Sequence, residues 1–230
     1  MIKAVGFDVG HTLIKYDNPL NWSSLYRPAL EKAVEGCNFI LSESMMISAI
    51  DVLTKYNTRM NDREIEVISD QIFHEILHSW NCSNKNKNTI KEGFYSYFQI
   101  NSTPFPETIE VLIKMKQAGI KTGILTDAAY GMDNKYSLQD ISVISNLIDI
   151  TFTSVDVGYR KPNPAGYIKL LNFFDISPDE MLYVGDEEKD IAGANNLGIL
   201  SVLVNRSTDI KDYGQKYTVS SLREIIHYLS

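Results

Sequence analysis

The sequence predicts an α/β fold in which a parallel sheet is interrupted, after its first strand, by a block of helices. Residues 2–13 read IKAVGFDVGHTL, a short apolar run without a helical period that ends at Asp8, as a buried parallel strand does. Residues 22–100 carry little strand signal and repeat apolar residues at helical spacing. From residue 104 onward, apolar strand-like runs alternate with helical patterns, which is typical of βαβ units.

The inserted block is expected to contain about four helices, each with one apolar face. The second is opened by Ser42 and the third begins near Asn61. The apolar faces, helix by helix, consist of Trp22, Leu25, Tyr26, Ala29, Leu30 and Ala33; Met46, Ile50 and Leu53; Ile65, Ile68, Ile72 and Ile76; and Ile90, Phe94, Tyr97 and Phe98. These side chains are expected to form the core of a separate helical unit.

After Pro104 and Pro106, the remaining elements are predicted to complete the sheet. The first helix runs from Glu107 to Gln117 with Ile109, Leu112 and Ile113 on one face, and Gly119 ends it. The later elements are, in order, the strand IKTGILTD, a helix over 136–147, the strand TFTS, a helix from Pro164 to Phe174, the strand MLYVGD, a helix ended by Gly198, the strand ILSVLV, and a last helix capped by Ser220 or Ser221. One strand cannot form a sheet alone. We therefore predict one domain from residues 1–16 and 104–230 and a helical domain from 17–103.

The composition restricts the function. The 230 residues carry a net charge of −7 and a pI of about 5.1, which argues against the basic surface that nucleic-acid binding needs. The longest apolar stretch, GILSVLV near residue 200, is too short to cross a bilayer. Cys37 and Cys82 match no metal-site spacing and no disulfide framework. We expect a cytoplasmic protein without a signal peptide, a membrane contact or a nucleic-acid partner.

Four polar positions follow predicted strands of the same sheet. Asp8 and Asp186 each end a strand, Thr126 ends another, and Lys161 lies beside the prolines of YRKPNP. Ligands of open α/β sheets bind at the carboxyl ends of the strands, so these side chains are expected to meet. Two carboxylates suit Mg²⁺, while a hydroxyl, backbone amides and an ammonium suit an anion. Together they are suited to attack on phosphorus, because the cation and the lysine neutralise the developing charge.

The chain resembles the haloacid dehalogenase (HAD) superfamily of hydrolases with a helical cap after the first strand. The matching segments are FDVGHTL, GILTD, RKPNP and VGDEEKDIAGANNLG. The resemblance implies a Rossmann-like core and a Mg²⁺-dependent phosphatase that forms an aspartyl-phosphate on a small phosphorylated metabolite. It implies that Asp8 is the nucleophile, that Thr126 and the amide of Asp127 hold the phosphate, and that Lys161 anchors both. It places Mg²⁺ on Asp8, the carbonyl of Gly10, Asp186 and Asp190.

Two residues depart from the family pattern. Phosphatases of the family carry a second aspartate, the general acid and base, at the position that Gly10 occupies here. Losing such a group typically costs about 10²–10⁴ in rate. The departure therefore predicts a slow phosphatase, a preference for a good leaving group such as an acyl phosphate, or a replacement acid, for which His11 is the neighbouring candidate. Asp127 stands where Asn or Gly is common, and it would repel phosphate unless it turned away or took a proton.

Other reactions remain open at this stage. Dehalogenases of the superfamily also lack the second aspartate and use no metal, but the retained Asp186 and Asp190 favour a metal. Phosphonate cleavage needs a cap lysine, for which Lys15 and Lys32 are the candidates by position. A phosphate-binding regulator without catalysis is the third alternative.

Two further features lie in the inserted block. The stretch HEILH, with His74, Glu75 and His78, matches the H-E-x-x-H pattern of zinc peptidases, although the third ligand is not defined by spacing, and Glu92 is only a candidate. We interpret it mainly as a solvated or partly packed helix face. Substrate choice is expected to lie in the cap, where Tyr16, Trp22 and Arg27 lie near the first junction, with Arg27 either meeting a second substrate anion or forming a surface ion pair.

Overall fold

The computed structural model describes residues 1–37, 40–99 and 102–229. Within them, six parallel strands form one sheet in the order β5-β4-β1-β6-β7-β8. In that order the strands are β5 Ile150–Thr153, β4 Lys121–Thr126, β1 Ala4–Phe7, β6 Met181–Gly185, β7 Leu200–Val204 and β8 Tyr217–Val219. The predicted α/β fold class is therefore confirmed, and the sheet is Rossmann-like.

Strand β1 lies in the middle of the sheet because all four of its residues are buried and apolar or glycine. It pairs with β4 on one side and β6 on the other, with Phe7 beside Ile124 and Val184. Since the pairing is parallel, the carboxyl ends of the three strands lie side by side. Thr126 and Gly185 end β4 and β6, and Asp8 follows β1, so the residues from these three positions onward meet at one edge.

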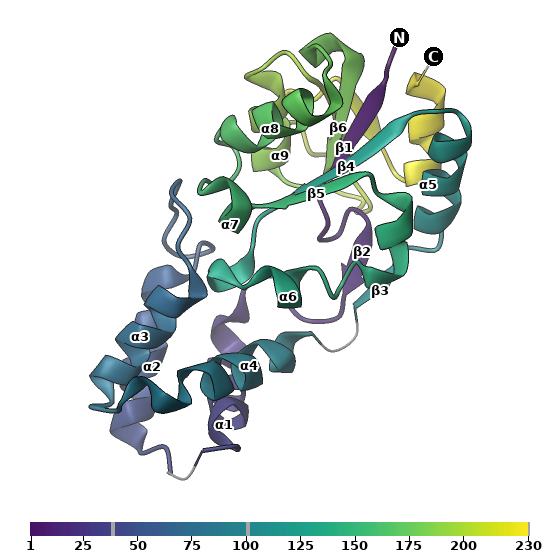
Figure 1. Cartoon of the computed structure of the whole chain (residues 1–230). Coiled ribbons are helices and arrows are strands. Elements are labelled where there is room, and N and C mark those ends of the chain that lie inside the picture. Colours follow the sequence, from purple (N-terminus) through teal and green to yellow (C-terminus); the bar gives the residue numbers. More distant parts are fainter. Residues whose placement is uncertain (38–39, 100–101, 230) are drawn as a thin grey trace.

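Helices cover both faces of the sheet (Figure 1). One face packs on α5 Thr108–Gln117 and the 3₁₀ helices η4 Ser142–Leu147 and η6 Leu222–Tyr228. The other packs on α8 Ala165–Phe174 and α9 Glu188–Asn195. The remaining short helices of this half are η3 Ala129–Gly131, α6 Asn134–Ser137, α7 Ser154–Val157 and η5 Pro178–Glu180.

A second hydrophobic cluster lies within the inserted helices. They are η1 Trp22–Leu25, α1 Tyr26–Val34, α2 Glu43–Tyr56, α3 Ser69–Ser79, η2 Asn84–Asn86 and α4 Lys87–Phe98. Figure 1 shows α1–α4 gathered at one end of the molecule, away from both termini. The cluster also takes in residues from the segment after β4, among them Ala128 and Tyr130. That segment therefore belongs to the helical core although it follows a strand of the sheet.

The predicted third helix of the insert begins too early. Helix α3 begins at Ser69, not near Asn61, and Ile65 and Ile68 are exposed by 66% and 56%. Ile65 instead forms a bridge with Tyr159 of the sheet domain. The isoleucine spacing matched a helix, but this segment makes its backbone contacts with another part of the chain.

Helix α5 presents a different face from the predicted one. Ile109 and Ile113 are exposed by 43% and 39%, while Val111, Leu112 and Met115 are buried. Both sets have helical spacing, and Leu112 belongs to each. The sheet selects the second set because it packs with β1 and β4 residues in one cluster.

Other boundaries also differ from the prediction. The helix expected over 136–147 is split into α6 and η4, and the last helix is the 3₁₀ helix η6, capped by Ser221. Strand β8 was not predicted. Strands β2 Ile14–Tyr16 and β3 Ser102–Pro104 form a small antiparallel sheet where the chain enters and leaves the insert. Three-residue strands have too few positions to reveal a period.

No helix among the described residues is long and apolar enough to cross a bilayer. The two cysteines, Cys37 and Cys82, are free thiols. The cytoplasmic location stays a prediction.

The loop between α2 and α3 fastens the insert to the sheet domain. The buried carboxylate of Glu66 accepts hydrogen bonds from the guanidinium of Arg160, from Arg63 at 3.0 Å and from the Ser154 hydroxyl at 2.5 Å. The backbone N–H of Glu66 also donates a hydrogen bond to the carbonyl oxygen of Gly158. Arg160 precedes Lys161, so this contact also braces the lysine segment.

Removing that buried carboxylate is expected to destabilise the protein strongly. In Glu66→Ala the buried Arg160 loses its closest carboxylate, and breaking a buried ion pair from one side costs about 3–5 kcal/mol. Urea unfolding should show the loss as a lower midpoint. The matched control is Glu43→Ala, which removes the close but exposed partner of Arg27 and should change the midpoint far less. Equal shifts for the two variants would contradict the prediction.

Candidate active site

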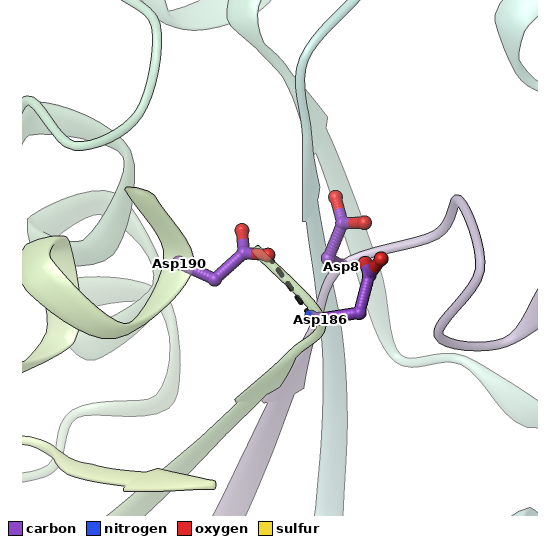
Figure 2. Close-up of side chains that lie close together, drawn as sticks. All are labelled: Asp8, Asp186 and Asp190. Atoms are coloured by element: carbon purple, nitrogen blue, oxygen red, sulfur yellow. Dashed lines mark hydrogen bonds between the residues drawn. The ribbon is translucent and has the colours of Figure 1, made fainter. Parts of the chain in front are cut away.

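Three aspartates meet at the carboxyl edge of the sheet. Asp8 follows β1, Asp186 follows β6, and Asp190 lies on the first turn of α9. Each offers a carboxylate oxygen, and these oxygens lie within 4.8 Å of one another. Figure 2 shows Asp8 and Asp186 projecting side by side from the strand ends, with Asp190 reaching toward them from the helix.

Lys161 is buried against two of the three carboxylates. Its Nζ lies 2.5 Å from Oδ1 of Asp8 and 2.6 Å from Oδ1 of Asp190. Burial alone would lower the pKa of Lys161, but Asp190 and Asp8 hold that pKa well above its usual range. The ammonium is therefore charged and fixes the direction of the Asp8 carboxylate.

Asp190 is engaged through both of its oxygens. While Oδ1 accepts from Lys161, Oδ2 accepts the backbone N–H of Asp186 at 3.2 Å, drawn in Figure 2, and that of Glu187 at 3.1 Å. A Cβ at position 185 would lie 2.3 Å from the Cβ of Asp190, so Gly185 is needed for this approach. Asp190 thus positions both Lys161 and the turn that carries Asp186.

Asp186 has no close cationic partner comparable to Lys161 among the ion pairs of the described residues. The Thr12 hydroxyl donates to its Oδ1 at 3.2 Å. Burial, with repulsion from Asp8 and Asp190, raises the pKa of Asp186 to about 8. Three carboxylates beside one ammonium leave an excess of negative charge, and this oxygen-rich, under-neutralised set fits a divalent cation such as Mg²⁺.

Asp127 turns away from the place where it would repel an anion. Its Oδ2 lies 2.9 Å from Nζ of Lys189 and 3.9 Å from Arg160, and its Oδ1 accepts the N–H of Lys161 at 3.1 Å. Burial would raise the pKa of Asp127, but Lys189, Lys161 and Arg160 together lower it below its usual range. Of the two alternatives that the sequence left open, the structure adopts the first: the side chain is turned away and ionised.

A cavity of about 190 Å³ lies between the sheet edge and the inserted helices. Asp8, Gly10, Thr126 and Asp127 are part of its wall, whereas Lys161 is buried just behind Asp8. The sequence-predicted site residues are thus brought together. The wall also contains Trp22 and Tyr130, and the full set from the insert and its junctions is Tyr16, Asn18, Pro19, Leu20, Trp22, Tyr56, Asn57, Thr58, Arg59, Phe98 and Gln99.

Position 10 has room for a side chain. Gly10 does not have a positive φ, and a Cβ there would lie 3.7 Å from the Tyr16 ring, an ordinary contact. His11, the neighbouring candidate acid, is not among the described residues that line the cavity. It has φ 55° and packs edge-on against Tyr16, and burial lowers its pKa. The geometry therefore does not favour His11 as the replacement acid.

The HEILH stretch lies on α3 with His74 and His78 exposed. Glu75 pairs with Lys55 at 2.7 Å and accepts the Tyr56 hydroxyl at 2.7 Å. Among the described residues, the side chains that lie close enough together to hold a metal ion are the three aspartates at the sheet edge. The interpretation of HEILH as a helix face is supported.

Arg27 forms an exposed ion pair with Glu43 at 2.6 Å and does not line the cavity. Of the three residues expected near the substrate, Tyr16 and Trp22 do line it. A charge network in the wall was not predicted: Lys189 pairs with both Asp127 and Glu187, and Arg59 of the insert also pairs with Glu187. The available signal was that Glu187 and Lys189 adjoin Asp186 in VGDEEKD.

The fold and the site define a Rossmann-like α/β protein with a helical insert over a carboxylate–lysine site. The chain belongs to the haloacid dehalogenase-like hydrolase family, whose model matches residues 40–204. It is 26% identical over 212 residues to a glyceraldehyde 3-phosphate phosphatase of Methanopyrus kandleri, covering 90% of this chain and 85% of the relative. It is 30% identical over 138 residues to the pyrophosphatase PpaX of Bacillus cereus (strain B4264), covering 57% and 63%.

Solved structures show the same fold. A 2-haloacid dehalogenase from Pseudomonas syringae pv. tomato DC3000 superposes with a TM-score of 0.71 at 19% identity, over 100% of this chain and 98% of the other. A HAD phosphatase from Thermococcus onnurineus superposes with 0.68 at 21% identity, over the same shares. The predicted resemblance and the hydrolase class are confirmed.

Proposed function

We propose that the protein is a Mg²⁺-dependent phosphatase of small phosphorylated metabolites that works through an aspartyl-phosphate on Asp8. The observation that carries the proposal is that Asp8 lines the cavity while its carboxylate is held at 2.5 Å by the buried, charged Lys161. An ionised carboxylate with a fixed direction is a suitable nucleophile. The phosphatase relatives support the reaction class.

Each residue of the site has a proposed role. Asp8 attacks phosphorus, Thr126 and the amide of Asp127 hold the phosphoryl oxygens, and Lys161 neutralises charge on both partners. The ligands proposed for Mg²⁺ are Asp8, the carbonyl of Gly10 and Asp186, and Asp190 supports them. When bound, the cation would offset negative charge on the nucleophile and the phosphoryl group. Residues 1–16 and 104–230 are proposed as the catalytic domain and 17–103 as the cap.

The alternative reactions have less support from the site. The cluster of three carboxylates is a poor environment for metal-free dehalogenation, because their repulsion needs a cation. Lys15 and Lys32, the candidate phosphonatase lysines, are half-exposed or more and form ion pairs with Asp17 and Glu35. Neither is among the described residues that line the cavity.

The first experiment measures phosphate release from acetyl phosphate and p-nitrophenyl phosphate with Mg²⁺ and with EDTA. Both substrates have leaving groups that need little protonation, so the glycine at position 10 should not prevent turnover. We expect release with Mg²⁺, and loss of release with EDTA that added Mg²⁺ restores. Equal turnover in EDTA would exclude the metal-dependent mechanism, and phosphate or vanadate binding without turnover would indicate a regulator.

A further inference from the structure

The far wall of the cavity is aromatic. The rings of Trp22 and Phe98 are stacked, with centroids 3.7 Å apart and planes 3° apart, and Tyr130 stacks on Trp22 at 5.2 Å. All three line the cavity that contains Asp8. Aromatic side chains make this wall apolar, and an aromatic ring of a ligand packs favourably against such side chains, offset-stacked or edge to face.

The cations of the cavity wall are already paired. Among the described residues that line the cavity, the cationic side chains are Arg59, Arg160 and Lys189. Arg59 pairs with Glu187, Arg160 with Glu66, and Lys189 with Asp127 at 2.9 Å and Glu187 at 3.0 Å. A second anionic group on a substrate would compete with these carboxylates for the same cations.

The cavity also offers little help to a leaving group that must be protonated. Position 10 has no side chain. The carboxylate of Asp140 accepts hydrogen bonds from Tyr16 at 3.0 Å and Ser102 at 3.2 Å, and Glu187 accepts one from Arg59. In these contacts both wall carboxylates accept hydrogen bonds. Burial raises the pKa of Asp140, while the hydrogen bonds from Tyr16 and Ser102 favour its ionised form. A leaving group that departs as a stable anion suits this site best.

We propose that the cavity selects aryl phosphates, the phosphoric monoesters of uncharged phenols. The inference rests on the proposed function. An oxygen of the Asp8 carboxylate bonds to phosphorus while the bond from phosphorus to the aryl oxygen breaks, and the phenolate leaves with that electron pair and takes a proton from water. A second water then hydrolyses the aspartyl-phosphate, which releases phosphate and restores Asp8. The small cavity, below the roughly 300–1,000 Å³ common for drug-sized ligands, fits a single ring.

Four substrates separate the parts of this proposal in the Mg²⁺-loaded wild-type protein. Phenyl phosphate should exceed benzyl phosphate in kcat/KM by about 10²-fold, because both carry a ring but only the phenol departs without protonation. The kcat/KM for phenyl phosphate should exceed that for 4-carboxyphenyl phosphate by about tenfold, because the added carboxylate meets no free cation. Acetyl phosphate reports the basal reaction. Turnover of acetyl phosphate without these preferences would overturn the inference alone, whereas no turnover of any substrate would overturn the proposed function and the inference with it.

Two variants test the wall itself. Trp22→Leu should lower the ratio of kcat/KM for phenyl phosphate to that for acetyl phosphate by about tenfold, and the distant exposed aromatic variant Phe173→Leu should leave the ratio unchanged. Leu20→Lys places a cation at an exposed position of the wall. It should raise the kcat/KM for 4-carboxyphenyl phosphate relative to that for phenyl phosphate about fivefold. If the Trp22 variant does not fold, the Leu20 variant decides, and an unchanged ratio there overturns the inference.

Discussion

Asp8→Asn is expected to reduce Mg²⁺-dependent phosphate release by about 10⁴-fold or more, the scale typical for loss of a catalytic nucleophile. The amide has nearly the same shape as the carboxylate, but it is a poor nucleophile and loses the charge that faces Lys161. The fold should survive, because Lys161 keeps its 2.6 Å contact with Asp190. Release from acetyl phosphate, measured over hours, gives the rate.

A matched control and a chemical trap make the result specific. Asp51→Asn makes the same substitution on the exposed side of α2 and should keep wild-type activity. Acid quenching of the wild-type reaction, followed by mass spectrometry, should find a phosphoryl group on the peptide that contains Asp8 and none in Asp8→Asn. Substantial turnover by Asp8→Asn, or a phosphorylated residue elsewhere, would exclude Asp8 as the nucleophile.

Gly10→Asp is expected to raise the rate on ordinary alkyl esters such as glyceraldehyde 3-phosphate by about 10²-fold, the lower end of the usual contribution of a general acid and base. The added Cβ meets only the Tyr16 ring at 3.7 Å, and the backbone there needs no positive φ, so the side chain fits. The gain on acetyl phosphate should be smaller, because its leaving group departs without protonation.

Gly10→Asn is the control for that gain. It adds a side chain of the same size that cannot exchange a proton, so the rate on alkyl esters should stay near the wild-type value. Equal gains in the two variants would show that the effect is steric. No gain in Gly10→Asp would indicate that the wild-type protein already has another acid, with Asp140 of the cavity wall as the residue to replace next.

Local pattern was sufficient for most of the fold and for the residues at the sheet edge. A buried strand needs a short apolar run, and such runs precede Asp8 and Asp186. Parallel strands end at one edge, so the order of the segments alone brought the aspartates, Thr126 and Lys161 into one predicted site. Ser42 and Gly119 marked helix ends through local backbone chemistry, and the structure confirms both.

The remaining features depend on contacts between distant segments, which no local period encodes. On α5, Ile109 and Ile113 have the same helical spacing as Val111 and Met115. Packing against the sheet determines that the second pair is buried. Ile65 has helical spacing but bridges to Tyr159. Asp127 does not repel a bound anion, because its charge is offset by Lys189, Arg160 and the backbone N–H of Lys161. The paired cations and the stacked rings of the cavity arise in the same way, since charge balance and ring packing are properties of neighbours in space, and the fold selects those neighbours.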